Sequence, residues 1–166
     1  YMVISVALLG FGASGTALAF TKTWFVKRKN RAVPILMALC GLSMSLIMLF
    51  SSRLLGSFDS YLLFLNFSQA YSLVVIYFAF FVPFFLGALA IGLVYAIHVQ
   101  RVGSLYFSDL FGSGIGGLAM IGLCWFIYPV SLSALISILP VLGGLLILPR
   151  EDYKKAFVPA LLALAL

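Results

Sequence analysis

The strongest constraint on the fold is a series of long apolar stretches separated by short polar ones. Of the 166 residues, 64% are hydrophobic and only 8% are charged, whereas a soluble domain carries about 25% charged residues. Because so few charges cannot cover a water-facing surface, the composition predicts an integral membrane protein. The apolar runs approach the ~20 residues of a transmembrane helix, whereas barrel strands alternate over about 10 residues. The expected fold class is therefore all-α, a polytopic helical membrane bundle.

This bundle is expected to form a single transmembrane domain over residues 1–166, with about five full transmembrane helices and a truncated sixth. Residues 51–68 carry apolar side chains at helical spacing among serines and an aspartate, which predicts an interfacial segment on the outer side. Pro83 is expected to kink the third span. Because the last span stops midway, we expect the chain to continue or to be a fragment. The predicted spans are 1–24, 32–50, 71–96, 109–127, 131–148 and, incomplete, 157–166.

The positive charges collect on one side of this predicted topology. Of the ten Lys and Arg residues, only Arg53 falls on the opposite side. An excess of Lys and Arg marks the cytoplasmic side of a membrane, so the N-terminus is expected outside. The net charge of +6 could indicate nucleic-acid binding, but no soluble basic fold fits between the apolar runs, so no nucleic-acid partner is expected. The residues on the basic side are Lys22, Lys27, Arg28, Lys29, Arg31, Arg101, Arg150, Lys154 and Lys155.

Two glycine patterns, residues 10–15 and 112–117, match the literal GxGxxG spacing of dinucleotide sites. Such a site also needs a preceding strand, a following helix and an acid about 20 residues further on. Neither pattern has that acid and both lie in predicted spans, so we predict no cofactor. Small residues near four-residue spacing let helices approach closely, which predicts packing faces. The residues expected on these faces are Gly12, Gly15, Ala88, Gly92, Ser108, Gly112 and Gly116.

Polar residues next to the spans are the remaining candidates for a functional or structural site. Asp109 is expected in the first turn of its helix, as a cap or as an ion-pair partner of Arg101. Its alternative role is ligand or proton handling, because a carboxylate in a membrane is costly. His98 and Tyr106 are expected at the membrane interface. The sequence has no Ser/His/Asp arrangement, carboxylate pair at catalytic spacing or Cys/His cluster, so no catalytic or metal-binding residue is predicted.

One segment carries a family resemblance. Residues 83–87 (PFFLG) and 101–112 (RVGSLYFSDLFG), with the glycine-rich residues 8–15, resemble the transmembrane part of bacterial membrane-embedded spermidine-synthase-like proteins. In that family a PFF.G helix leads to a G.LYF.DL.G...G segment. The positions that match this second motif include Tyr106, Asp109 and Gly112.

The resemblance implies a multi-helix region in the bacterial inner (cytoplasmic) membrane, followed by a cytosolic Rossmann-type domain. That domain would resemble aminopropyltransferases, which move an aminopropyl group from decarboxylated S-adenosylmethionine to a diamine. The sequence contains no such soluble domain, so no catalytic residue is carried over and the enzyme assignment stays open. The roles of the matched positions also stay open.

Three functions remain after this reasoning. The first is a membrane-anchoring and regulatory domain of a spermidine-synthase-like protein, and the second is a structural subunit packed in a larger membrane complex. The third is half of a small-solute transporter, because spans one and four begin glycine-rich and cross in opposite directions. A polyamine carrier would need several carboxylates, whereas Asp59 and Asp109 are expected on opposite sides. The expected partners are the lipid bilayer and other membrane helices, in a homo-oligomer or with partner subunits.

Overall fold

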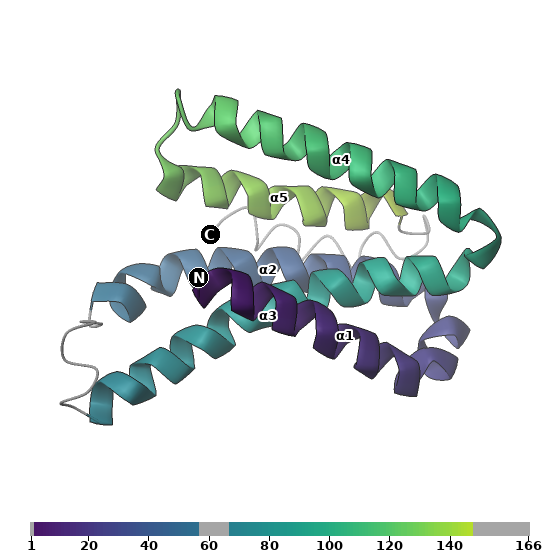
Figure 1. Ribbon diagram of the computed structural model, residues 1–166, viewed down its shortest axis with the longest axis horizontal. Coiled ribbons are helices and arrows are strands. Elements are labelled where there is room, and N and C mark those ends of the chain that lie inside the picture. The colour runs from purple at the N-terminus through teal and green to yellow at the C-terminus, as the bar shows by residue number, and fades with distance from the viewer. Residues whose placement is uncertain (1, 57–66, 148–166) are drawn as a thin grey trace.

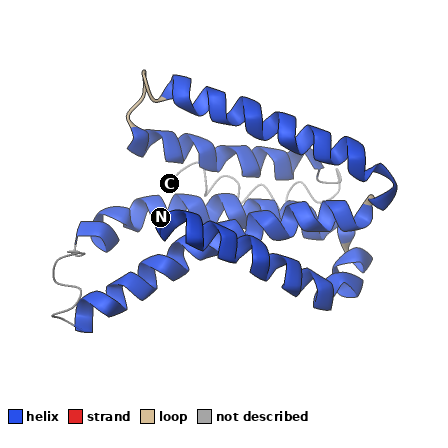
Figure 2. Cartoon of the chain, in the orientation of Figure 1, coloured by secondary structure: helices blue, strands red, loops and turns tan. Residues whose placement is uncertain are grey.

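The structure is a computed structural model that describes residues 2–56 and 67–147, and these residues are almost entirely helical (Figure 1). Short connections join the helices and the described ranges contain no strand (Figure 2). The all-α fold class is therefore confirmed. The helices are α1 (Met2–Lys27), α2 (Lys29–Gly56), α3 (Phe67–Ile97), the one-turn 3-10 helix η2 (Val99–Arg101), α4 (Val102–Leu123) and α5 (Pro129–Ile147).

Successive α-helices run in opposite directions, so their connections alternate between the two ends of the bundle. In Figure 1 the α1–α2 and α3–α4 connections lie at the right-hand end and the α4–α5 connection lies at the left-hand end. The packing order is α1 on α3, α3 on α2 and α2 on α5. By contrast, α4 makes extensive contact with no other α-helix. It therefore stands apart from the packed part of the chain.

The helices extend beyond several predicted spans. Residues 51–56, predicted as the start of an interfacial segment, continue α2, while residues 57–66 lie outside the described ranges. The incomplete sixth span, residues 157–166, also lies outside them. Pro83 lies at the middle of α3, and Figure 1 shows that this helix changes direction along its length. A proline there removes one backbone N–H and crowds the preceding turn, which accounts for the bend.

Glycines allow the closest helix contacts, because a side chain at these positions would collide with the facing helix. A Cβ added at Gly10 of α1 would lie 2.9 Å from the Cβ of Phe84 on α3. At Gly41 of α2 it would lie 2.5 Å from the Val141 Cγ2 atom and 2.7 Å from the backbone oxygen of Ser137 on α5. Small residues thus pack these helices, as expected for membrane helices.

The predicted packing positions behave differently from one another. On α3, Ala88 is buried, and a Cβ added at Gly92 would lie 3.1 Å from the Leu18 Cδ2 atom of α1. A Cβ added at Gly12 or Gly15 would meet nothing within 4 Å in the described part of the chain. The same holds for Gly112 and Gly116, and Ser108 beside them is exposed. A role for these α1 and α4 residues in packing against another chain stays a prediction.

Two described helical segments, Val3–Lys27 and Tyr71–Ile97, are long and apolar enough to cross a membrane. The apolar segments Arg31–Ile47 and Leu135–Ile147 are shorter. Length and composition alone support membrane association only weakly, because a core helix of a soluble protein or a signal sequence shares them. Five full spans are not supported by this criterion within the described residues.

Candidate functional site

A cavity of about 820 Å³ lies between α2, α3, α4 and α5. It is bordered by residues 33–44 of α2, 87–95 of α3 and 105–113 of α4. These are the parts of the three helices nearest to the α1–α2 and α3–α4 connections. The cavity exists because α4 runs past the other helices without packing closely against them.

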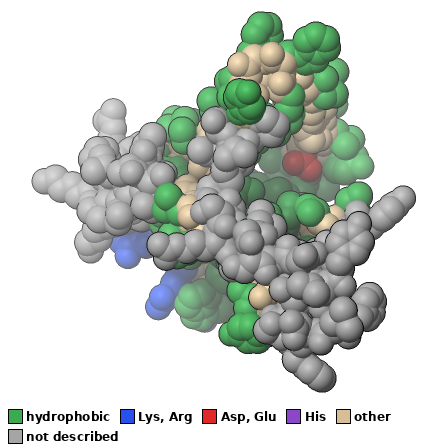
Figure 3. Space-filling view, turned by 90° about the vertical axis from the view of Figure 1, so that its left-hand side faces the viewer, with side chains coloured by type: hydrophobic (Ala, Val, Ile, Leu, Met, Phe, Trp, Pro, Cys, Tyr) green, Lys and Arg blue, Asp and Glu red, His purple; other side chains and the backbone are tan. Residues whose placement is uncertain are grey.

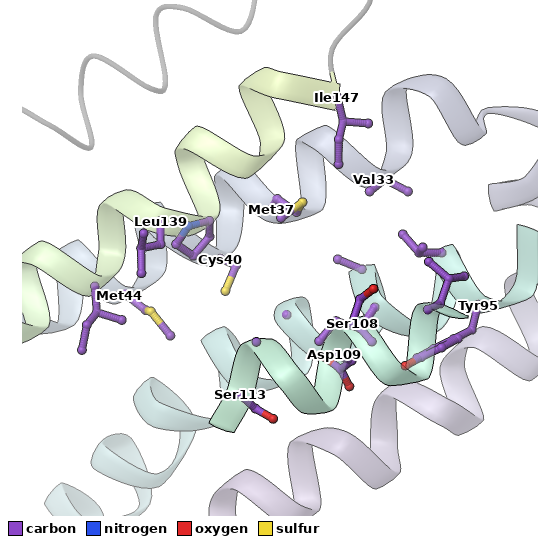
Figure 4. A pocket seen from close by; sticks show the side chains of 18 residues that line it. Val33, Met37, Cys40, Met44, Tyr95, Ser108, Asp109, Ser113, Leu139 and Ile147 are labelled. Carbon is purple, nitrogen blue, oxygen red and sulfur yellow. The ribbon is translucent and has the colours of Figure 1, made fainter. Parts of the chain in front are cut away.

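One wall of the cavity is apolar and rich in sulfur. Met37, Cys40 and Met44 follow one another at three- and four-residue spacing, which places them on one face of α2. Figure 4 shows their side chains on the side of the cavity opposite Ser108 and Asp109. Cys40 is 5% exposed, and its thiol donates to the backbone oxygen of Pro83 at 3.4 Å. This wall can hold an apolar group but carries no charge.

The facing wall is formed by α4 and is more polar. Leu105, Ser108, Asp109 and Gly112 share one helix face, and Ser113 lies beside them. The Ser108 hydroxyl donates to the Ser104 backbone oxygen at 3.0 Å, and the Ser113 hydroxyl donates to that of Leu110 at 3.0 Å. Both serines therefore direct their donors into their own helix. The Asp109 carboxylate is left as the charged group of this wall.

The predicted capping role of Asp109 is wrong. The α4 helix begins at Val102, so Asp109 lies about two turns inside it, and the first turn contains no acidic residue. The N-cap residue is Arg101, whose side chain makes no capping hydrogen bond. The prediction put the start of this helix at Asp109 because that residue is polar. Residues 102–108 contain no proline, however, and the helix continues directly from η2. Within the described residues, Asp109 and Arg101 form no ion pair.

Tyr95 joins this polar wall from α3, and sequence reasoning missed it. Its hydroxyl oxygen is buried and forms no hydrogen bond of ordinary geometry within the described chain. The charge that acts most strongly on it is the Asp109 carboxylate, and Figure 4 shows the two side chains as neighbours. A tyrosine in an apolar run needs a hydrogen-bond partner for its hydroxyl. This need was the sequence feature that could have identified Tyr95 as a site residue. The partner could not be chosen without knowing how α3 and α4 face each other.

The other polar candidates lie outside the cavity lining. His98 is exposed at the end of α3, with its Nδ1 atom 3.3 Å from the Val94 backbone oxygen. Arg101 and Tyr106 are exposed as well. Of the four polar residues singled out from the sequence, only Asp109 borders the cavity, together with Ser108 and Gly112 from the predicted packing set.

The groups that the described lining presents suit the binding of a ligand. Among the described residues, no group of three His, Cys, Asp or Glu side chains is placed to hold a metal ion. One carboxylate beside one phenol, facing an apolar wall, provides no pairing of a nucleophile with a separate base. The arrangement suits a ligand with one positive group and an apolar body.

No protein-family model, curated protein or solved structure matches the chain. The spermidine-synthase-like relationship therefore stays a prediction that rests on the motif residues alone.

Proposed function

We propose that the chain is a membrane-embedded helical domain that anchors and regulates a larger protein. The observation that carries this is the apolar surface left exposed after the helices have packed. Only 17% of the best apolar window of α1 and 28% of that of α3 is buried, whereas a core helix of a soluble protein is mostly buried. The α4 helix has no buried residue over its 22 residues. A surface of this kind is stable in lipid or against partner helices, and it would promote aggregation in water.

The arrangement of the helices supports a transmembrane topology with more than two crossings. At 1.5 Å per residue, the 22 residues of α4 span about 33 Å and the 19 residues of α5 about 28 Å. Both lengths are close to the ~30 Å hydrocarbon core of a bilayer. Successive helices run in opposite directions (Figure 1), so a chain that crosses with α1 would cross again with each following helix. We therefore favour five crossings.

Basic residues at one end of the bundle support the orientation. Of the described Lys and Arg residues, all but Arg53 lie at or near the α1–α2 and α3–α4 connections, which share one end in Figure 1. Arg28 stacks over the Trp24 ring with its guanidinium carbon 5.2 Å from the ring centroid. Lys and Arg favour the cytoplasmic side and Trp favours the interface. This end is thus the proposed cytoplasmic side of a bacterial inner membrane, with the N-terminus outside.

The anchored unit that we propose is a spermidine-synthase-like catalytic domain. Its support is the motif over residues 83–87 and 101–112. The motif lies on α3, η2 and α4, and includes the cavity residues Asp109 and Gly112. Enzymatic activity would then belong to a Rossmann-type domain on the cytoplasmic side. Membranes containing the full gene product are expected to transfer an aminopropyl group from decarboxylated S-adenosylmethionine to a diamine. Absence of the product, with a soluble spermidine synthase active in the same assay, would refute this assignment.

The cavity supports a second candidate function, in which the chain is half of a small-solute transporter. Transporters bind their solutes between helices that cross the membrane in opposite directions, and this cavity lies between such helices, toward the end that holds the α1–α2 and α3–α4 connections. Solute uptake or counterflow by the purified domain in liposomes would favour this candidate over an anchor.

The membrane topology can be tested with single thiols. Cys124 is exposed and follows the last residue of α4, at the proposed outer end. A Cys40→Ala variant leaves it as the sole thiol, and a membrane-impermeant maleimide added to intact cells is expected to label it. The matched control adds Gln100→Cys in η2 to a background with Cys40→Ala and Cys124→Ser. This control should be labelled only after the cells are permeabilised.

Two results would refute the proposed topology. The first is labelling of both positions in intact cells, which would place the two ends of α4 on one side. The second is recovery of the chain in the soluble fraction, without extraction from membranes by detergent.

A further inference from the structure

We propose that the cavity between α2, α3, α4 and α5 binds an alkylammonium ion, an organic molecule with one positive charge and an apolar body. In this arrangement the Asp109 carboxylate pairs with the ammonium group and the sulfur-rich face of α2 contacts the apolar body. This binding function goes beyond the anchoring role and does not depend on which domain is anchored.

The charge of the cavity lining selects a cation. Its described lining contains the Asp109 carboxylate and no Lys, Arg or His. The hydroxyls of Ser108 and Ser113 are directed to backbone oxygens of their own helix. Figure 3 shows an acidic side chain in a recess between hydrophobic ones; among the described residues the sole Asp or Glu is Asp109. A carboxylate in apolar surroundings is stabilised by an opposite charge that also donates hydrogen bonds.

One carboxylate matches one positive charge. A ligand with two or more ammonium groups would find no second carboxylate in the described lining, and an unpaired charge held inside the cavity is unfavourable. The cavity therefore discriminates against diamines and polyamines. A monoamine is the amine that this lining can neutralise.

The Tyr95 hydroxyl supplies a second polar contact. Its oxygen is buried with no hydrogen-bond partner of ordinary geometry in the described chain, and the Asp109 carboxylate acts on it at close range, although buried polar groups are nearly always well paired. An ammonium group has three N–H donors, and a phenol oxygen accepts a hydrogen bond as well as donating one. An ammonium beside Asp109 would thus donate to the carboxylate and to the Tyr95 oxygen.

The opposite wall fits the apolar body of such a ligand. Met37 and Met44 are flexible, polarisable side chains that adapt to ligand shape, and they face α4 across the cavity (Figure 4). Leu139 and Pro140 of α5 extend this wall. The volume of about 820 Å³ falls within the ~300–1,000 Å³ typical of small-molecule sites.

The alkylammonium group could come from a soluble monoamine or from the headgroup of an aminophospholipid. The test therefore uses the purified chain in nanodiscs of phosphatidylglycerol, titrated by calorimetry with 4-phenylbutylamine, which is a cation at neutral pH. The matched ligand is 4-phenylbutanol, which has the same apolar body without the charge. A second set of nanodiscs contains phosphatidylethanolamine, and weaker binding of the soluble amine there would identify the lipid headgroup as a competitor. Equal binding in both would identify a soluble amine as the ligand.

The expected result is that the amine binds about tenfold or more tightly than the alcohol, because charge-assisted hydrogen bonds are the strong ones. Asp109→Asn should abolish this preference, whereas Asp59→Asn, which removes the same charge elsewhere in the sequence, should retain it. Gly112→Leu should weaken binding of both ligands at least tenfold, since it adds a side chain where the chain leaves open space. Gly114→Leu makes the same change outside the cavity lining, also into open space, and should bind normally. The dication 1,4-diaminobutane should not compete.

Several results would overturn the assignment. Equal affinity for the amine and the alcohol, or an unchanged preference for the amine in Asp109→Asn, would show that the carboxylate does not bind the ammonium group. If no binding is detected at amine concentrations up to the millimolar range, the cavity is not an amine-binding site. If Asp109→Asn fails to fold, the comparison of Gly112→Leu with Gly114→Leu still tests the site. Equal ligand binding by these two variants would show that the ligand binds outside the cavity. A chain found in the soluble fraction that still prefers the amine would refute the membrane proposal alone.

Discussion

Gly41→Ala provides the sharpest test of the packing between α2 and α5. An added Cβ would lie 2.5 Å from the Val141 Cγ2 atom and 2.7 Å from the Ser137 backbone oxygen. The second contact is with backbone, so a change of side-chain rotamer at Val141 cannot relieve it and the two helices must separate. Overpacking of this kind costs about 1–3 kcal/mol. Alanine has a higher helix propensity than glycine, and this offsets about 0.5–1 kcal/mol of the overpacking cost.

A matched control separates these two contributions. At Gly12 of α1 an added Cβ meets nothing within 4 Å in the described chain, so Gly12→Ala should show the helix-propensity gain alone. The propensity contribution cancels when the two variants are compared. The difference in their free energies of unfolding should therefore equal the collision alone, about 1–3 kcal/mol.

Thermal or denaturant unfolding of the purified chain in detergent micelles, followed by circular dichroism, measures this difference. Each kcal/mol should move the midpoint by about 2–4 °C for a chain of this size. Adding Val141→Ala to Gly41→Ala should recover only part of the loss, because the contact with the Ser137 backbone oxygen remains. Equal stability of Gly41→Ala and Gly12→Ala, or full recovery in the double variant, would refute the close α2–α5 approach.

Three further variants test other contacts of the fold and the site. Ser45→Ala should lower the free energy of unfolding by about 0.6 kcal/mol, because it removes the hydrogen bond between the buried hydroxyls of Ser45 and Ser137, whose oxygens lie 3.0 Å apart; unchanged denaturant midpoints would contradict this. Tyr95→Phe should change the stability of the ligand-free chain little, since the hydroxyl has no hydrogen bond of ordinary geometry in the described structure, but calorimetry should show weaker amine binding. Asp109→Asn should leave the thermal midpoint of the ligand-free chain unchanged or higher, whereas a loss equivalent to about 0.5–2 kcal/mol would be the signature of the rejected capping role.

Much of the fold could be predicted from the sequence because the apolar runs are long and few polar residues interrupt them. The number and approximate positions of the described helices follow from those runs. Their ends were less predictable: α4 begins at Val102 instead of Asp109, since η2 leads into it without a break. Polarity marks where a helix leaves an apolar environment, and a helix can continue past that point. The start of α4 therefore had to come from the structure.

The helix contacts were only partly predictable for a related reason. Small-residue spacing identifies faces that can pack, but it does not say which of them do. Gly10 makes the close approach to α3, whereas the predicted Gly12 and Gly15 face open space. Gly12 and Gly15 lie two and five residues after Gly10, about 200° and 140° around the helix from it, so the choice depends on which face of α1 meets α3 at the crossing point of the two helices. That crossing point is fixed by side chains of both helices together, which a local pattern does not contain.

The segment with the most distinctive sequence is also the least packed one, and this difference bears on its role. Residues selected for packing within the chain would be buried, yet α4 has no buried residue. Asp109 and Gly112 border the cavity, while Phe107 and Phe111 stack at 5.8 Å between ring centroids and lie on the opposite side of the helix by its 3.6-residue period. One face is thus suited to the ammonium group of the proposed ligand and the other to lipid or a partner helix. Since the packing of the described helices does not account for the pattern, we infer that its physical explanation lies in what binds to α4 from outside them.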